Sequence, residues 1–429
     1  MTSPVSAARS AGESARRPPR TDLEVWAAID AEVLRQESEL ELIASENHAS
    51  AEVLAAMGTA LSNKYAEGYP GRRYYGGCEH VDTVENLARD RAKRLFGCEH
   101  ANVQPHSGTQ ANIAALMALA APRDRVLSMS LDHGGHLSHG HAKNFTGLFY
   151  EVHSYGVEKG SERLDMDRVR AIAREVRPKV IIAGASAYSR TLDFQAFASI
   201  AREVGAKLLV DMAHVAGLVA AKVHPSPVGH ADVVTLTTHK TLRGPRGGMI
   251  LAGADWIKQL NSTVFPGGQG GPLMHVIAAK AVALREALDP AFTAYQRRVV
   301  DNARILAAAL AQRGLRIVSG GTDNHLMLVD VTPKSLSGKQ AEDLLHAVDI
   351  TCNKNLIPYD PRPPMEASGI RLGTAAVTTR GLAEEHMPKL AGWIADVLSK
   401  PGDEAIARRV RGEVAEVARA FPIYAAPRS

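Results

Sequence analysis

Short apolar runs alternate with helical stretches along the middle of the chain, and this alternation constrains the fold more than any other feature. Helices are expected at 109–120, near 167–176 and at 194–204. Around them lie the β-rich runs ANVQ, RVLSMSL, KVIIAG, KLLVDMAH, ADVVTLT and GGMILAG. Such alternation is typical of an α/β fold with a largely parallel sheet. Because ligands bind such folds at the carboxyl ends of the strands, the loops there are where we expect the chemistry.

The rest of the chain divides into an arm, a second unit and a tail. Helical spacing is seen at 22–43 and again around 275–312, where the chain leaves the sheet region. The residues that follow, with NHLMLVDV and GIRLGT as strands, predict a smaller α+β unit. We therefore predict four parts, which are a disordered tail at 1–20, a helical arm at 21–58, a large domain at 59–298 and a small C-terminal domain at 299–429.

The net charge is concentrated in the tail. The 429 residues carry a formal net charge of +4, and Arg9, Arg16, Arg17 and Arg20 stand there against one acid, Glu13. A tail rich in Arg, Ser, Ala and Pro is typical of disorder, and an organelle transit peptide is the alternative. So small an excess of charge does not predict nucleic-acid binding. No stretch approaches the ~18 apolar residues of a membrane span, so no membrane association is expected.

Cysteine usage favours a reducing compartment. Cys78, Cys98 and Cys352 are scattered along the chain and form no CxxC pair. This odd number and spacing fit neither a disulfide framework nor a zinc ribbon, and we expect a cytoplasmic protein.

Ionisable side chains stand at the ends of two neighbouring predicted strands. The run KLLVDMAH ends with Asp211 and His214, and ADVVTLTTHKTLRGPRGG places Thr237, His239 and Lys240 after the next strand. A carboxylate at a strand end suits a buried cation such as a protonated pyridine nitrogen, and a helix cap is the alternative. A lysine there suits Schiff-base chemistry if burial and cationic neighbours lower its pKa, whereas most lysines simply face solvent.

Two further motifs suit an anion and a planar ring. Ser107, Gly108 and Thr109 stand between a short strand and an Ala-rich helix. Hydroxyls and free backbone N–H groups at a helix N-terminus bind phosphate, and a cap without a ligand is the alternative. The segment LDHGGHLSHGH holds four histidines, but its Gly-Gly pair prevents one helical face and the chain has no HExxH motif, so we predict no metal site. A histidine stacked on a planar cofactor fits this segment equally well.

Together these motifs predict pyridoxal 5′-phosphate as the cofactor. It requires a phosphate anchor, a carboxylate that keeps the ring nitrogen protonated, and a lysine amine. Each motif alone has an ordinary structural alternative, so the prediction depends on their combination.

The chain also resembles the serine hydroxymethyltransferase family of fold-type I pyridoxal-phosphate enzymes. The matching segments are LELIASEN, NKYAEGYPGRRYYGG, NVQPHSGTQAN, HGGHLSHG, DMAHVAGL, TTHKTLRGPRGG, VFPGGQGGP, NHLMLVDV, NKNLIPYDP and GIRLGT. They run in family order from about residue 22 to the closing FPIY. The resemblance implies an aspartate-aminotransferase-like large domain with a mixed, mostly parallel sheet, followed by a smaller α+β domain.

The resemblance further implies roles for individual residues. Lys240 would carry the cofactor, Asp211 would hold its ring nitrogen and His136 would stack on its ring. The remaining implied cofactor contacts are Ser107, Gly108, Thr109, Ser186, His214 and His239, with Tyr65 and Gly271 reaching the phosphate from a partner subunit. The implied groups around the amino acid are Arg371 and Ser45 at its carboxylate, Glu67 as the proton-transfer acid, Tyr75 beside that acid, and Thr237. The implied folate-facing positions are Glu67, Tyr74, Leu131, Gly135, Leu137 and Asn355.

The activity implied is the reversible transfer of the hydroxymethyl group of serine to tetrahydrofolate, by an obligate homodimer with shared active sites, or by a tetramer. Asp132 stands where many members carry alanine, His48 replaces a common phenylalanine, and Leu236 replaces a hydroxyl residue. These departures leave open a paralogue that acts on α-methylserine or as a β-hydroxy amino acid aldolase. A non-catalytic binding protein on the same scaffold is disfavoured, because the lysine, aspartate and arginine of the site are all present.

Overall fold

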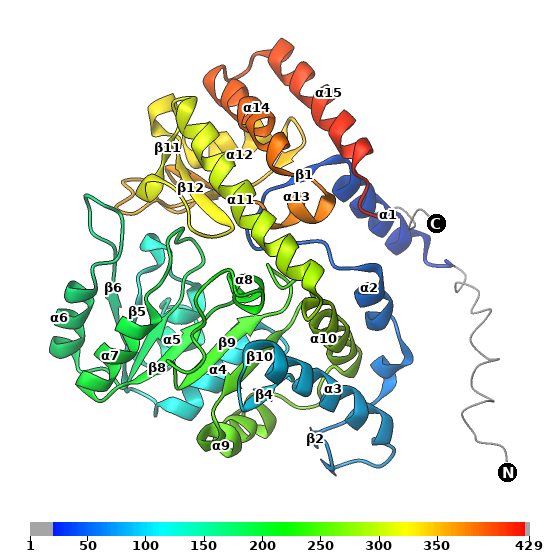
Figure 1. Ribbon diagram of the computed structural model, residues 1–429, viewed down its shortest axis with the longest axis vertical. Helices are drawn as coiled ribbons and strands as arrows, with labels where there is room; N and C mark the ends of the chain where they lie inside the picture. The colour runs from blue at the N-terminus through cyan, green and yellow to red at the C-terminus, as the bar shows by residue number, and fades with distance from the viewer. Residues whose placement is uncertain (1–19, 425–429) are drawn as a thin grey trace.

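A seven-stranded mixed sheet forms the centre of the larger unit in the computed structural model, which describes residues 20–424 (Figure 1). Its strands are β4 (His100–Asn102), β5 (Arg125–Met129), β6 (Glu151–Tyr155), β7 (Val180–Ala183), β8 (Lys207–Asp211), β9 (Val233–Thr237) and β10 (Gly248–Ala252). Their order across the sheet is β4-β10-β9-β8-β7-β5-β6. The five strands from β6 to β9 pair in parallel, whereas β10 is antiparallel to both β9 and β4. The expected α/β class with a mostly parallel sheet is confirmed.

Helices cover both faces of this sheet. They are α3 (Glu79–Phe96), α4 (Gly108–Leu119), α5 (Phe145–Phe149), α6 (Met166–Val176), α7 (Phe194–Val204), α8 (Ala216–Ala220), α9 (Ile257–Ser262) and α10 (Met274–Ala287). Successive side chains of a strand point to opposite faces, and in β8 Leu208 and Val210 join one core cluster while Leu209 joins the other. Both faces are therefore buried, which explains why the strand sequences are apolar throughout.

The smaller unit is built on a four-stranded sheet of order β11-β12-β15-β14. Its strands are β11 (Arg316–Ile317), β12 (Leu326–Asp330), β14 (Asn353–Asn355) and β15 (Gly369–Gly373). Its helices are α12 (Gly338–His346), α13 (Ala375–Arg380), α14 (Met387–Ser399) and α15 (Glu404–Ala420). The helix α11 (Pro290–Gln312) runs from the larger unit into this one, as Figure 1 shows. The predicted domain boundary at 298/299 falls inside α11 and stays a prediction.

Three local expectations differ from the structure. The helical stretch at 22–43 is a helix only over α1 (Leu23–Ser38), because Leu40 and Leu42 are fully buried in the core of the smaller unit. There β1 (Leu40–Glu41) pairs in parallel with β13 (Ile350–Thr351). The stretch at 275–312 is two helices, because Asp289 caps α11 and Pro290 occupies its first turn. The edge strand β6 has a partly exposed, mixed sequence and was not predicted.

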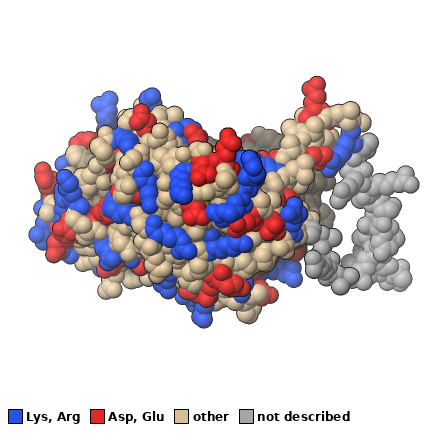
Figure 2. All heavy atoms as spheres, turned by 90° about the horizontal axis from the view of Figure 1, so that it is seen from above, with Lys and Arg blue, Asp and Glu red and all other residues tan. Residues whose placement is uncertain are grey.

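The N-terminal arm lies on the outside of the molecule. Helix α1 has no buried residue and lies beside α15, and the chain then passes through α2 (Ala51–Met57) and the hairpin of β2 (Gly68–Tyr69) and β3 (Arg72–Arg73) (Figure 1). The predicted tail lies outside the described residues except for Arg20. Basic and acidic side chains intermingle over the face seen in Figure 2. Among residues 20–424, no helix has the length and apolar character needed to cross a membrane.

Candidate active site

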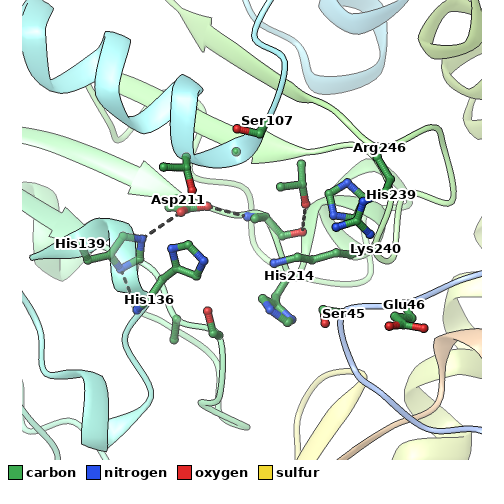
Figure 3. A pocket seen from close by; sticks show the side chains of 16 residues that line it. Ser45, Glu46, Ser107, His136, His139, Asp211, His214, His239, Lys240 and Arg246 are labelled. Atoms are coloured by element: carbon green, nitrogen blue, oxygen red, sulfur yellow. Dashed lines mark hydrogen bonds and ion pairs between the residues drawn. The ribbon is translucent and has the colours of Figure 1, made fainter. Parts of the chain in front are cut away.

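Two adjoining cavities open where the parallel strands end. The first, of about 310 Å³, receives residues from the loops after β7, β8 and β9, from the start of α4 and from the arm (Figure 3). The second, of about 380 Å³, shares Ser45, His136, Ser186, His214 and Lys240 with the first. It extends to Asn355 and Arg371 of the smaller unit. The two units thus form one continuous site around Lys240.

Lys240 lies in the turn that follows β9 and is only 7% exposed. Burial lowers the pKa of its amine to about 8, and the positive charges of Arg371 and Arg246 act in the same direction, while Asp211 opposes them. A lysine is nucleophilic only in its neutral form, so a lowered pKa favours attack on a carbonyl. The environment that the sequence predicted for this lysine is present.

Asp211, at the carboxyl end of β8, is held in place by three donors. Its Oδ2 accepts hydrogen bonds from Asn112 Nδ2 and His139 Nε2, both at 2.9 Å, and its Oδ1 accepts from the backbone of Ala213 at 3.0 Å. Burial alone would raise the pKa of this carboxyl, but the bonds from His139 and Asn112 and the nearby imidazoles hold it below its usual range. The group is therefore a fixed negative charge at the base of the first cavity.

The same carboxylate belongs to a group of side chains with metal-binding chemistry. One nitrogen each of His136 and His139 and one oxygen of Asp211 lie within 4.8 Å of one another. However, His139 Nε2 is already hydrogen-bonded to Asp211, and Asn112 uses the same oxygen. We therefore interpret the group as a hydrogen-bonded cluster, and the prediction of no metal stays a prediction.

The predicted phosphate cradle forms the upper wall of the first cavity in Figure 3. Ser107 caps α4 by accepting from Gln110 N at 3.2 Å, and a Cβ on Gly108 would lie 2.5 Å from Thr237 Cγ2. Only glycine therefore lets the helix start approach the end of β9 this closely. The helix N-terminus, with Thr109 in its first turn, presents N–H groups and a positive dipole end to the cavity.

His239 and Arg246 line the same cavity as the cradle. Among residues 20–424, the buried Nδ1 of His239 has no hydrogen-bond partner. Burial, followed by the charge of Arg246, lowers the pKa of this imidazole to about 3, so the ring is neutral. A neutral imidazole with a free nitrogen, a guanidinium and a helix N-terminus form a suitable site for a phosphate group. The residues present thus fit the phosphate end of pyridoxal phosphate.

Two histidines line the space between the cradle and the smaller unit. Ser138 N donates to His136 Nδ1 at 3.1 Å, and burial lowers the pKa of His136 to about 4. His214 is buried, and the pKa of its ring lies well below the ordinary value because of burial and the charges of Lys240 and Arg371. Both rings are therefore neutral, which suits contact with a flat aromatic cofactor.

Arg371 brings a buried positive charge from the smaller unit into the second cavity. Its Nη1 donates to Ser186 O at 2.8 Å, and its Nε and Nη2 lie 3.3 Å from Asn353 Oδ1 and 3.4 Å from Ser45 Oγ. The last two bonds are long, so the guanidinium keeps capacity for a stronger acceptor. A carboxylate is the acceptor that matches its two parallel N–H groups.

Four of the six predicted folate-facing residues line the second cavity. These are Leu131, Gly135, Leu137 and Asn355. Leu131 and Leu137 are 41% and 49% exposed, as expected for side chains that contact a ligand rather than pack in a core. The structure therefore brings these positions together with Lys240 and Arg371.

The remaining predicted residues form a separate cluster. Within the described chain, Tyr65, Glu67, Tyr74, Tyr75 and Gly271 line neither cavity. Tyr65 donates to Glu67 at 3.2 Å, its ring lies 5.1 Å from that of Tyr75, and a Cβ on Gly271 would lie 3.2 Å from Tyr65. The three tyrosines are 47–75% exposed. In its own chain this cluster therefore lies outside the two cavities around Lys240.

Three residues of the site were not assigned a role from the sequence. Glu46 lines the first cavity, and Asn112 and His139 bind Asp211. Arg246, expected as a cationic neighbour of Lys240 together with Arg243, lines the first cavity and lowers the pKa of that lysine. Asn112 is a buried polar residue on an Ala-rich helix. A polar residue among alanines is the feature of the sequence that could have indicated its role. His139 was one of four closely spaced histidines, among which spacing alone could not choose.

Comparison with known proteins agrees with the resemblance seen in the sequence motifs, along nearly the whole chain. A family model described as serine hydroxymethyltransferase matches residues 19–394. The chain is 61% identical over 406 residues to a protein of Methylococcus capsulatus named serine hydroxymethyltransferase, covering 94% of this chain and 97% of that one. The chain belongs to the serine hydroxymethyltransferase family. Proteins of the same name from Acidobacterium capsulatum and Halorhodospira halophila are 59% and 57% identical over 405 residues, which are 94% of this chain and 95% and 97% of theirs.

Membership of the serine hydroxymethyltransferase family confirms the expected fold-type I architecture. The family is pyridoxal-phosphate dependent and takes tetrahydrofolate as cosubstrate. The roles of the individual residues stay predictions, and the geometry above gives each of them a physical basis.

Proposed function

We propose that the residues gathered around Lys240 carry out the reaction of the serine hydroxymethyltransferases. The chain is a pyridoxal-phosphate-dependent transferase that converts serine and tetrahydrofolate to glycine and 5,10-methylenetetrahydrofolate, reversibly. One observation supports the assignment of residues above all others. Lys240, Asp211 and Arg371, which come from two units of the chain, all line one continuous pair of cavities.

The first cavity supplies what the cofactor needs. When bound, pyridoxal phosphate supplies a carbonyl that condenses with amines and a pyridinium ring that withdraws electrons from the substrate. Ser107, Gly108, Thr109 and His239 would hold its phosphate, and the charge of Asp211 would keep its ring nitrogen protonated. Lys240 would attach it through an amine whose pKa is lowered to about 8.

The second cavity supplies the contacts for the amino acid and folate. Arg371, with Ser45, would bind the carboxylate of serine and so orient the rest of the molecule in front of Lys240. Leu131 and Leu137, which line the second cavity and not the first, would contact the benzoyl ring of tetrahydrofolate. The carboxyl of Glu67 would then transfer protons between the hydroxymethyl group and folate.

We further propose that Glu67 acts in the site of a second subunit, in a homodimer. The Tyr65–Glu67 cluster includes three exposed tyrosines and lines neither cavity around Lys240 in its own chain. Exposed aromatic residues beside a carboxylate are unusual on a free surface and typical of an interface. Tyr65 and Gly271 would then reach the phosphate of the partner, and the same contacts permit a tetramer of two such dimers.

We also propose a cytoplasmic location. Cys78, Cys98 and Cys352 are free thiols, and two of them are buried. Burial raises the pKa of Cys98 to about 11, so its thiol is unreactive. Free thiols of this kind are compatible with a reducing compartment.

The assignment is tested with the purified holoenzyme and a pair of lysine variants. Lys240→Ala is expected to lose the visible absorption band of the lysine-bound cofactor and the formation of glycine from serine and tetrahydrofolate. Lys258→Ala, on an exposed lysine of α9, is the matched control and should keep both. A normal band in Lys240→Ala would refute the assignment.

Substrate preference is tested on the wild type. Faster turnover of α-methylserine than of serine would identify the specialised paralogue.

The shared site is tested by mixing two inactive variants. Lys240→Ala and Glu67→Gln are unfolded, mixed and refolded together, so that some dimers combine one subunit of each. Each mixed dimer then contains one complete site, and on the order of a quarter of wild-type activity is expected from random pairing. Mixtures that stay inactive, although mixed dimers are shown to form, would contradict the contribution of Glu67 across the interface.

A further inference from the structure

Lys280 of α10 is a fully buried lysine that the proposed mechanism does not use. It is 1% exposed, and its Nζ donates to three backbone carbonyls, those of Val103 at 2.7 Å, Gly248 at 2.8 Å and Pro105 at 3.0 Å. An ammonium group has three donors and no acceptor, so three carbonyl oxygens satisfy it completely. A neutral amine would instead turn its lone pair toward one of them. The geometry is therefore that of a protonated lysine, although burial lowers its pKa to about 7 against the charge of Glu85.

The carbonyls that Lys280 binds belong to the two segments that carry the phosphate cradle. Val103 and Pro105 lie in the short connection from β4 to Ser107, and Gly248 is the first residue of β10. The strands β4 and β10 are paired as far as Asn102, and Gly248 N continues the contact by donating to Pro105 O at 3.0 Å. Lys280 thus joins the strands where their regular pairing ends, immediately before the cradle begins.

A second side chain, Gln269, binds the same connection. Gln269 donates through Nε2 to the carbonyl of Gln104 at 3.0 Å, and its Oε1 accepts from the backbone N–H of His106 at 3.0 Å. Lys280 therefore binds the carbonyls on either side of Gln104, while Gln269 binds that of Gln104 itself. The backbone leading to Ser107 is fixed along its whole length.

Packing connects Lys280 to the opposite wall of the cradle as well. A Cβ on Gly247 would lie 2.5 Å from Lys280 Cε, and a Cβ on Gly248 would lie 2.3 Å from the carbonyl oxygen of Ser107. The carbonyl of Gly247 accepts from Thr238 N at 3.1 Å, one residue before His239. The aliphatic part of Lys280 is thus wedged between both segments that would contact a phosphate.

We propose that Lys280 is a positioning residue for phosphate recognition, which holds the Val103–Thr109 segment against β10 so that the start of α4 faces the bound anion. This proposal rests on the proposed function, in which that cradle binds the phosphate of the cofactor. The positive charge of Lys280 also reaches the cradle, since it contributes to the lowered pKa values of His106 and His239. A buried cation with no acid bonded to it adds attraction for an anion nearby.

The test compares pyridoxal phosphate with pyridoxal, which lacks the phosphate ester, in binding to the cofactor-free protein. Lys280→Met is expected to weaken pyridoxal phosphate at least tenfold and to change the affinity for pyridoxal less than twofold. It should also weaken inhibition of cofactor binding by inorganic phosphate. Lys258→Met, the exposed control, should leave all three values unchanged. Equal losses for both ligands, or no loss for either, would overturn the proposal, because a general loosening of the fold does not select for phosphate.

Three further variants keep the test decisive. If Lys280→Met does not fold, Lys280→Gln and Gly247→Ala are measured in the same way, because the first removes the charge and the second displaces the lysine side chain. Ser107→Ala separates this proposal from the proposed function. The preference for pyridoxal phosphate over pyridoxal could be reduced in Ser107→Ala but normal in the Lys280 and Gly247 variants. That result would overturn only the role of Lys280. No preference for the phosphorylated ligand in the wild type would overturn the phosphate cradle itself.

Discussion

Replacing Arg371 by methionine is expected to stabilise the cofactor-free protein while it destroys serine binding. Arg371 is 9% exposed, and burial lowers the pKa of its guanidinium from 12.5 to about 10, with the charge of Glu46 acting in the opposite direction. One pKa unit is worth about 1.4 kcal/mol, so the folded protein disfavours the charged form by about 3 kcal/mol. This cost is present in full below pH 10 and disappears only as the pH rises from about 10 toward 12.5.

The substitution removes this cost together with three hydrogen bonds. Only the bond to Ser186 O, at 2.8 Å, is short, and its loss is worth about 1–1.5 kcal/mol. The balance favours Arg371→Met by roughly 1–2 kcal/mol, in line with the general effect of replacing a buried charge by an apolar group of similar size. Because the unfolding entropy grows with chain length, we expect the midpoint of thermal unfolding of this 429-residue chain to rise by roughly 1–2 °C.

Two measurements test this reasoning. The midpoint is compared by circular dichroism for cofactor-free wild type, Arg371→Met and Arg304→Met, whose side chain is 58% exposed and serves as the control. The KM for serine, measured on the loaded enzymes, should rise about 100-fold or more in Arg371→Met alone, because two charge-assisted hydrogen bonds to the carboxylate are lost. A lower midpoint than wild type would refute the desolvation cost, and an unchanged KM would refute the carboxylate contact.

Three other predictions concern the same site. Because the neutral amine of Lys240 reacts, the rate at which the cofactor-free protein takes up pyridoxal phosphate should rise with pH and level off above about 8; a rate that still climbs toward pH 10.5 would contradict the lowered pKa. Asp211→Asn should reduce kcat by roughly 100-fold or more while the KM for serine changes little, since the negative charge beside the cofactor ring is lost; near-normal kcat would exclude that role. Asp132 is half-exposed and follows Leu131 of the second cavity, so its charge should repel the carboxylates of folate. Asp132→Ala should therefore lower the KM for tetrahydrofolate about twofold to fivefold at low salt and leave it unchanged at high salt. Equal KM values at low salt for the variant and the wild type would show that Asp132 does not act on folate.

The sequence was most informative where chemistry follows from local position along a strand. Asp211 and Lys240 come at or after the ends of β8 and β9, which are parallel neighbours. Because the carboxyl ends of parallel strands lie at the same edge of a sheet, both side chains are expected there. The start of α4 was predictable for the same reason, since Ser107 is a typical capping residue between a strand and a helix. These predictions needed no knowledge of distant contacts.

The sequence was least informative where two distant segments meet. Nothing local indicates that Leu40 pairs with Ile350, or that Asn112 and His139 both bind Asp211. Burial of Lys280 is equally hidden, because lysines on helices ordinarily face solvent and the three carbonyls that retain this one come from other elements. In each case a tertiary partner overrides the local preference.

The helix α11 has a mechanical consequence for substrate binding. It is a continuous rod of 23 residues, about 35 Å long, whose first turn lies on the larger unit and whose last turns pack in the core of the smaller one. A change of about 5° in its direction at Asp289 would therefore displace its far end by roughly 3 Å, the length of a hydrogen bond. Arg371 travels with that end, whereas Lys240 stays with the sheet. The stiffness of this helix, together with direct bonds between the units from Arg371 to Ser186 O and from Arg190 to Asp323, limits how far the carboxylate contact can shift relative to the reacting lysine.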